Sequence, residues 1–297
     1  MSLLHLRTFI EVYRQRSLTG AARALGLTQP AVSQQIASLE AQLGRPLFER
    51  HARGVRPTTI AEDLAASLGQ TLDAAEAALA AVRARSMRLS GTVHIAAPSD
   101  FLSEFVAGRL KPLVEAGLDL RLHIGGKEAL YAMLLDDRVH LALTASRPED
   151  RRLAHKQIGL ERLIAVAAPT VAQAVAARSS LDEGIKAVPY LAYDLDRPLI
   201  RTWLEANGLG PPDRQPAVTA PDLRAIRTML EAGLGWSVMP DYLVIAAIRA
   251  GALMEIRAPV VTPENAFYLV WARSALRHPR VAFARDALLS AIGAAPA

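Results

Sequence analysis

A chain of 297 residues has room for two or three domains, and its 51% hydrophobic content makes wholesale disorder improbable. It contains no cysteine, which excludes disulfides and thiolate metal sites. No stretch approaches the roughly 18 uncharged apolar residues that a spanning helix needs, and the N-terminus lacks the apolar core of a secretion signal. We therefore expect a cytoplasmic protein.

The net charge of +5 is concentrated at the start of the chain. Residues 1–60 contain eight arginines and three glutamates, which accounts for the whole excess. Such a local basic excess suits a polyanionic partner, although many solvated surfaces are also basic.

Three short helices are predicted in this basic segment. Apolar residues repeat at helical spacing over residues 3–15. Ser17 is a suitable N-cap for a second helix, which Gly26 can end in a left-handed conformation. Thr28 is a suitable N-cap for a third helix, and Pro30 is tolerated in its first turn.

The spacing of small and branched residues within these helices favours a helix-turn-helix. Counted from Leu18, Ala22 occupies the fifth position, Gly26 the ninth and Val32 the fifteenth. A small residue lets two helices cross closely, a glycine permits the turn, and a branched residue fills the corner. An ordinary helical hairpin remains the alternative at this point.

A short hairpin is predicted next, over residues 46–58. Two extended runs flank Arg53-Gly54, and Arg50 and Arg56 stand beside the turn. After a recognition helix such a hairpin is a wing, placed to contact phosphates or the minor groove. The alternative is a solvated charged loop.

The segment FIEVYRQRSLTGAARALGLTQPAVSQQIASLEAQLGRPLFER, residues 9–50, resembles the DNA-binding domain of LysR-type transcriptional regulators. The resemblance implies a dimer or tetramer that binds operator DNA and responds to a small-molecule effector, with RNA polymerase as a further partner. Members of that family often carry arginines where this chain has Gln34, Ala37 and Ser38, which leaves the base preference open. The expected DNA contacts are Thr28, Gln29, Pro30, Ser33, Gln34, Arg50, Arg53 and Arg56.

A long helix is predicted over residues 59–89, where there is no proline and apolar residues recur at spacings near a heptad. Such a stripe either lies on its own domain or pairs with a second chain. In the resembled family this segment is the dimerisation helix. The expected dimer contacts are Leu64, Leu68, Leu72, Leu79 and Val82.

After Gly91 the predicted strands and helices alternate, which favours a mainly parallel sheet covered on both faces. Strands are expected at residues 92–97, 118–124, 141–145, 163–168, 188–193, 217–219, 236–239 and 267–272. Helices are expected at 101–115, 128–135, 199–206, 222–232, 242–250 and 280–292.

The order of these elements resembles the two-lobed, periplasmic-binding-protein-like effector domain of the same family. The predicted fold is therefore mixed. It has a winged helix-turn-helix over residues 1–58, a linker helix over 59–90 and an α/β effector domain over 91–297. Lobe I takes residues 91–162 and 266–297, and lobe II takes residues 163–265.

Ligands of open α/β sheets bind at the carboxyl ends of strands. Asp100 is either a helix N-cap or a carboxylate for a ligand amine, and Lys127 is either surface charge or a partner for a ligand carboxylate. We expect a small polar metabolite bearing a carboxylate, with an amine as a second group. The expected effector contacts are Ser99, Asp100, Phe101, Lys127, Ser146, Tyr193 and Thr219.

Three rival functions fit the sequence less well. An enzyme is disfavoured because metal-ligand histidine spacing, a phosphate-binding loop, a dinucleotide fingerprint and a nucleophile elbow are all missing. We accordingly expect no catalytic residue, metal or cofactor. A solute-binding protein would need export, and a general nucleoid protein would not need a two-lobed domain.

Overall fold

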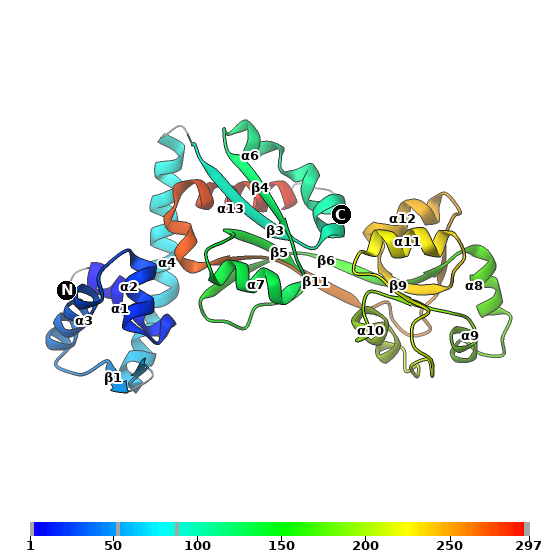
Figure 1. Cartoon of the computed structure of the whole chain (residues 1–297), viewed down its shortest axis with the longest axis horizontal. Coiled ribbons are helices and arrows are strands. Elements are labelled where there is room, and N and C mark those ends of the chain that lie inside the picture. Colours follow the sequence, from blue (N-terminus) through cyan, green and yellow to red (C-terminus); the bar gives the residue numbers. More distant parts are fainter. Residues whose placement is uncertain (1–2, 52–53, 87–88, 294–297) are drawn as a thin grey trace.

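The computed structural model describes residues 3–51, 54–86 and 89–293. A small helical domain lies at one end, a long helix runs beside it, and two α/β lobes follow in line (Figure 1). This is the predicted mixed architecture of a helix-turn-helix domain and a two-lobed α/β domain.

The N-terminal domain has the predicted helices and hairpin. Its core is formed where one apolar side of each helix meets the others, with Phe9, Val32, Leu39 and Leu47 inaccessible to solvent. The elements are α1 (Leu3–Gln15), α2 (Leu18–Leu25), α3 (Gln29–Leu43), β1 (Phe48–His51) and β2 (Gly54–Pro57).

The long helix α4 (Thr59–Ser86) packs against its own chain on two sides. Near its start, Leu64 and Leu68 contact the core of the N-terminal domain, and Leu72 is buried in that core with 8% exposure. Leu72 is thus covered by its own domain, whereas Leu64 and Leu68 are half-buried, and contacts of these three leucines with a second chain stay a prediction. Leu79 is 56% exposed, and the side chain of Val82 lies outside the described part.

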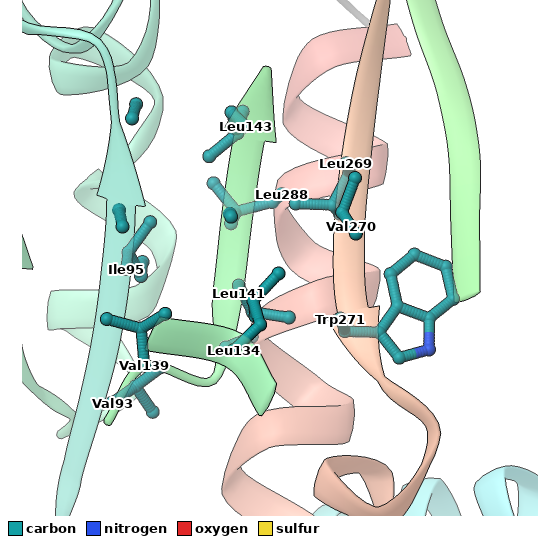
Figure 2. Close-up of a cluster of buried hydrophobic side chains, with 14 of the residues drawn as sticks. Val93, Ile95, Leu134, Val139, Leu141, Leu143, Leu269, Val270, Trp271 and Leu288 are labelled. Carbon is teal, nitrogen blue, oxygen red and sulfur yellow. The ribbon is translucent and has the colours of Figure 1, made fainter. Parts of the chain in front are cut away.

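The lobe next to α4 is built on a sheet with helices on both faces. Strand β3 (Thr92–Ala97) pairs in parallel with β4 (Asp119–Ile124) and with β5 (Leu141–Thr144). Figure 2 shows apolar side chains of β3, β5 and β11 (Glu264–Ala272) gathering with Leu288 of α13 (Pro279–Gly293). This core therefore joins the first strands of the lobe to the last helix of the chain.

Two long strands connect the lobes. β6 (Leu153–Ala167) pairs antiparallel with β11 in the first lobe and with β9 (Trp236–Pro240) in the second. Strand β10 (Met254–Ile256) also pairs with β6. Among the described residues one seven-stranded sheet thus runs through both lobes, in the order β10-β6-β11-β5-β3-β4 with β9 beside β6. The expected mainly parallel sheet is corrected, because β11 runs antiparallel to both β5 and β6, and β9 and β10 run antiparallel to β6.

Most of the remaining helices and strands lie in the second lobe. Helices α8 (Pro169–Ala176) and α9 (Leu181–Ala187) and strand β10 (Met254–Ile256) were not predicted. The other elements there match predictions, with shorter strands. They are β7 (Leu191–Ala192), β8 (Val218–Thr219), α10 (Pro198–Ala206), α11 (Leu223–Glu231) and α12 (Asp241–Arg249).

The helix expected over residues 101–115 is broken in the structure. It consists of α5 (Ser99–Phe101), a π-helical turn η1 (Leu102–Val106), a 3₁₀ turn η2 (Ala107–Arg109) and α6 (Lys111–Glu115). Pro112 lies in the first turn of α6. A proline there cannot continue an incoming helix, because its nitrogen has no hydrogen to donate.

Candidate functional site

The recognition helix α3 begins and ends on local signals. The Thr28 hydroxyl accepts a hydrogen bond from the Ala31 amide at 3.4 Å, and Gly44 ends the helix in the left-handed conformation. The preceding helix α2 is likewise capped by Ser17, whose hydroxyl accepts from the Gly20 amide at 3.1 Å. Gly26 follows at φ 65°, which makes the predicted turn.

One side of α3 is exposed to solvent. Val32, Ile36 and Leu39 are buried, whereas Gln34 on the opposite side is exposed. The predicted contacts Thr28, Gln29 and Pro30 are exposed at the N-terminal end of the helix, with Ser33 half-buried beside them. A major groove accepts such a helix end, and a glutamine can bond to adenine there.

The wing is tied to the recognition helix by contacts that the sequence did not reveal. A carboxylate oxygen of Glu40 accepts hydrogen bonds from the amides of Leu47, at 2.7 Å, and Phe48, at 3.1 Å. At Gly54 (φ 139°) an added Cβ would lie 2.5 Å from the Arg16 carbonyl oxygen. The backbone therefore places this hairpin against the turn that follows α1, at Arg16, and only a glycine at position 54 permits this approach.

The wing arginines are only partly described. Arg56 on β2 is exposed, opposite Glu49 on β1. Arg50 lies on β1, but its side chain falls outside the described part, and so does the whole of Arg53. The wing reading of this hairpin remains a prediction for those two arginines.

A cavity of 540 Å³ lies between the two lobes. Its walls come from the carboxyl ends of β3 and β5 and the start of α7 (Lys127–Leu135) on one side, and from α10, α11 and α12 on the other. β6 and β11 contribute where they cross between the lobes. The residues that line the cavity include Asp100, Phe101, Lys127, Glu128, Thr144, Ala145, Ser146, Glu161, Tyr193, Asp194, Tyr242, Glu264, Asn265 and Phe267.

Five of the seven expected effector contacts line this cavity, namely Asp100, Phe101, Lys127, Ser146 and Tyr193. Asp100 is not the N-cap of α5, because Pro98 occupies that position. Its carboxylate accepts from the backbone amides of Asp100 and Phe101, while burial raises its pKa above the ordinary value.

The other two expected contacts, Ser99 and Thr219, are not among the lining residues. The Ser99 hydroxyl donates to a carboxylate oxygen of Asp222 at 3.0 Å, so it joins the two lobes. Asp222 also pairs with Arg224 at 2.6 Å, and Arg224 donates to the Ser103 hydroxyl at 2.6 Å. These contacts connect the two lobes beside the cavity.

Sequence reasoning missed three residues at the crossing strands. Glu161 on β6 is 4% exposed and accepts a hydrogen bond from the Asn265 side chain on β11 at 2.9 Å. Burial, together with the negative charges of Asp100 and Asp241, raises the pKa of Glu161 to about 8. Tyr242 on α12 completes this group, its pKa raised by burial and then by Asp100 and Glu161.

A network of ion pairs joins the N-terminal domain to the effector domain. Arg277, on the turn η3 (Arg273–Arg277), pairs with Glu11 of α1 at 2.8 Å and donates to the Ala24 carbonyl at 3.0 Å. Arg273 pairs with Asp73 of α4 at 2.7 Å. An acidic residue such as Glu11 within an apolar helix face indicates in the sequence that a basic partner exists. The sequence does not indicate that this partner is Arg277.

Metal sites and membrane-spanning helices are both absent from the described residues. No group of three or more His, Asp or Glu side chains there could hold a metal ion. Nor does any helix among them combine the length and apolarity needed to cross a membrane.

Two family models match the chain. Residues 3–62 match the bacterial regulatory helix-turn-helix protein, lysR family, and residues 86–293 match the LysR substrate binding domain. The HTH-type transcriptional regulator AbaB of Streptomyces antibioticus is 37% identical over 294 residues, which cover 96% of this chain and 97% of AbaB.

Solved structures show the same fold. The full-length regulator LysG of Corynebacterium glutamicum with bound effector Arg superposes with a TM-score of 0.57 at 22% identity, covering 98% of each chain. Full-length CbnR in complex with its target DNA gives a TM-score of 0.54 at 20% identity, covering 98% of this chain and all of CbnR. With its capped recognition helix, its winged hairpin and its two-lobed cleft, the chain belongs to the LysR family of DNA-binding transcriptional regulators and is not an enzyme.

Proposed function

We propose that this protein is a sequence-specific regulator whose affinity for operator DNA is set by a small molecule bound in the cavity between its two lobes. The supporting observation is that both lobes and both crossing strands line one cavity in a chain that also carries the DNA-binding domain. The arginine in the LysG structure supports an effector role for this domain. In this proposal the chain has three parts, which are the DNA-binding domain (1–58), the linker helix (59–90) and the two-lobed effector domain (91–297).

A bound effector acts by favouring one lobe arrangement. A ligand that contacts Lys127 and Ser146 in one lobe and Tyr193 in the other stabilises the closed arrangement by its difference in affinity for the two states. The first lobe contacts α4 through α13 and η3. A change between the lobes therefore has a packed route to the helix that carries the DNA-binding domain.

We also propose that the protein acts as a dimer or tetramer in the cytoplasm, where operator DNA is found. In this proposal the exposed Leu79, on the second half of α4, contacts a second chain. Two recognition helices then meet successive half-sites. A contact with RNA polymerase remains a prediction from the family resemblance.

The test begins by mapping bound DNA across the genome, which yields an operator and names the neighbouring enzymes. Metabolites of those enzymes are then titrated against operator binding by the full-length protein. In the variant Ala145→Phe, which fills the cavity, we expect operator binding to persist and the metabolite response to disappear. The exposed Ala107→Phe serves as a control and should respond normally. An equal response in Ala145→Phe would place the effector elsewhere.

A further inference from the structure

The charge of the cavity between the lobes is strongly unequal. Among the described residues that line it, one lysine faces five carboxylates, which are Asp100, Glu128, Glu161, Asp194 and Glu264. Two of these, Asp100 and Glu161, are 4% exposed, whereas Lys127 is exposed at the rim. The interior of the cavity is thus acidic, in contrast to the carboxylate-binding role that was considered for Lys127.

Neither buried carboxylate has a cationic partner within ion-pair distance in the described part of the chain. Among the side chains of the described residues, only the neutral amide of Asn265 donates a hydrogen bond to Glu161. Arg224 acts on Asp100 from a longer distance, and its guanidinium is paired with Asp222. Buried carboxylates are normally paired, because desolvation of a lone charge costs several kcal/mol.

Aromatic rings stand beside these carboxylates. Phe101, Tyr242 and Phe267 line the cavity, with ring centroids 4.3 Å apart for Phe101 and Phe267 and 6.0 Å apart for Tyr242 and Phe267. The negative face of an aromatic ring attracts an organic cation, most strongly in a desolvated site. Carboxylates and aromatic rings together favour the same kind of ligand.

We propose that the effector carries an ammonium or guanidinium group that enters the cavity between Asp100 and Glu161, against the rings of Phe101, Tyr242 and Phe267. This inference rests on the proposed effector cavity and names the chemical class that it selects. The carboxylates come from α5 of one lobe and from the crossing strand β6, and Tyr242 comes from α12 of the other lobe. One cation therefore contacts both lobes and the strand between them.

The binding of a cation is linked to a proton. The titratable and charged groups around Glu161 are Asp100 on α5, Asp241 and Tyr242 on α12, and Glu264 on β11. Without ligand, Glu161 is mostly protonated below its pKa of about 8. A bound cation stabilises the ionised form, so binding releases a proton there, and the affinity should increase up to about tenfold per pH unit below that pKa and level off above it.

The test uses matched probes on the full-length protein by titration calorimetry. The sets are benzylamine, benzyl alcohol and benzoate, and butylguanidine with its neutral isostere butylurea. We expect each cation to bind at least about tenfold more tightly than its neutral or anionic partner, because hydrogen bonds between charged groups are about twice as strong as neutral ones. We also expect proton release on cation binding at pH 7.

Isosteric variants assign this preference to residues. Asp100→Asn and Glu161→Gln should each reduce the preference for the cation about tenfold, and proton release should disappear in Glu161→Gln. Glu115→Gln, the same change on the exposed surface of α6 and outside the cavity lining, should keep both. Should either buried variant fail to fold, the matched probes on the unmodified protein still decide the question.

The possible failures are distinguishable. Neutral or anionic probes that bind as tightly as the cations, and lose binding in Ala145→Phe, would overturn the cation and keep the effector cavity. Probe binding that is unaffected by Ala145→Phe would overturn both proposals. Failure of every cation to bind at tens of millimolar would overturn the cation proposal directly.

Discussion

The ion pair between Arg277 and Glu11 makes a quantitative prediction about how the two domains hold each other. Its side chains are 16% and 4% exposed, and Nη2 of Arg277 lies 2.8 Å from a carboxylate oxygen of Glu11. Removing one partner of a buried pair costs about 3–5 kcal/mol, since the other charge stays buried. Loss of the hydrogen bond to the Ala24 carbonyl adds about 1 kcal/mol.

A nearby arginine reduces this cost. Arg7 is attracted by Glu11 and repelled by Arg277, and that repulsion helps, after burial, to lower the pKa of Arg7. Without Arg277, Arg7 can therefore partly neutralise Glu11. We expect Arg277→Ala to cost about 3 kcal/mol, near the lower end of the range for buried pairs.

The assay is hydrogen exchange of the α1 amides, followed on the intact protein by mass spectrometry. Trp203, Trp236 and Trp271 all lie in the effector domain, so tryptophan fluorescence would not report on α1. Arg277→Ala should lower the opening free energy of these amides by about 3 kcal/mol. Adding Glu11→Gln to that variant should recover most of the loss, because no buried charge remains.

The control is Arg201→Ala, which removes an exposed pair. Its nitrogen lies 3.9 Å from Glu205, and the two side chains are 61% and 71% exposed. Such pairs contribute about 0–1 kcal/mol. If Arg277→Ala changed α1 exchange no more than Arg201→Ala changed exchange in its own helix α10, the coupling of the domains through Glu11 would be refuted.

Three further outcomes are expected. In a selection experiment, Gln34→Ala should reduce the base preference at one position per half-site by about 1–3 kcal/mol. Arg56→Ala should weaken binding to all DNA sequences alike and reduce the salt dependence of that binding. An unchanged base preference in Gln34→Ala would contradict the placement of α3. Glu161→Gln should match the parent in stability near pH 5 and exceed it by a few kcal/mol above pH 8. The reason is that the raised pKa of Glu161 makes its stabilising contribution disappear as pH increases through about 8. A difference in the free energy of urea unfolding between variant and parent that stayed constant at every pH would disprove this. Leu79→Glu should give folded monomers by light scattering, while Leu72→Glu should unfold the N-terminal domain; a dimeric Leu79→Glu would move the interface elsewhere.

The sequence by itself determined the elements of the DNA-binding domain and most strands and helices after it. Ser17, Gly26 and Thr28 delimit helices through contacts with residues at most four positions away. Such signals are readable because their partners are near in the sequence and the hydrophobic period is local. The ends of α2 and the start of α3 accordingly lie where they were predicted.

The composition of the cavity was decided by the tertiary structure. Asp100 and Lys127 were predicted from strand ends, but Glu161 and Asn265 reach the cavity only because β6 and β11 run through both lobes, and Tyr242 reaches it from α12. The pairing of Glu161 with Asn265 spans 104 residues. Alternation of strands and helices predicts lobes, but it does not predict the direction in which a long strand returns.

The leucine stripe of α4 shows the same division. Its period predicted a long helix with one apolar side, and α4 has that helix over Thr59–Ser86. Leu72 faces its own N-terminal domain while Leu79, on the same stripe, is exposed. A hydrophobic period predicts that one side of a helix is buried, because burial of apolar area is favourable whatever covers it. Which surface covers that side is decided by how the chain packs in three dimensions.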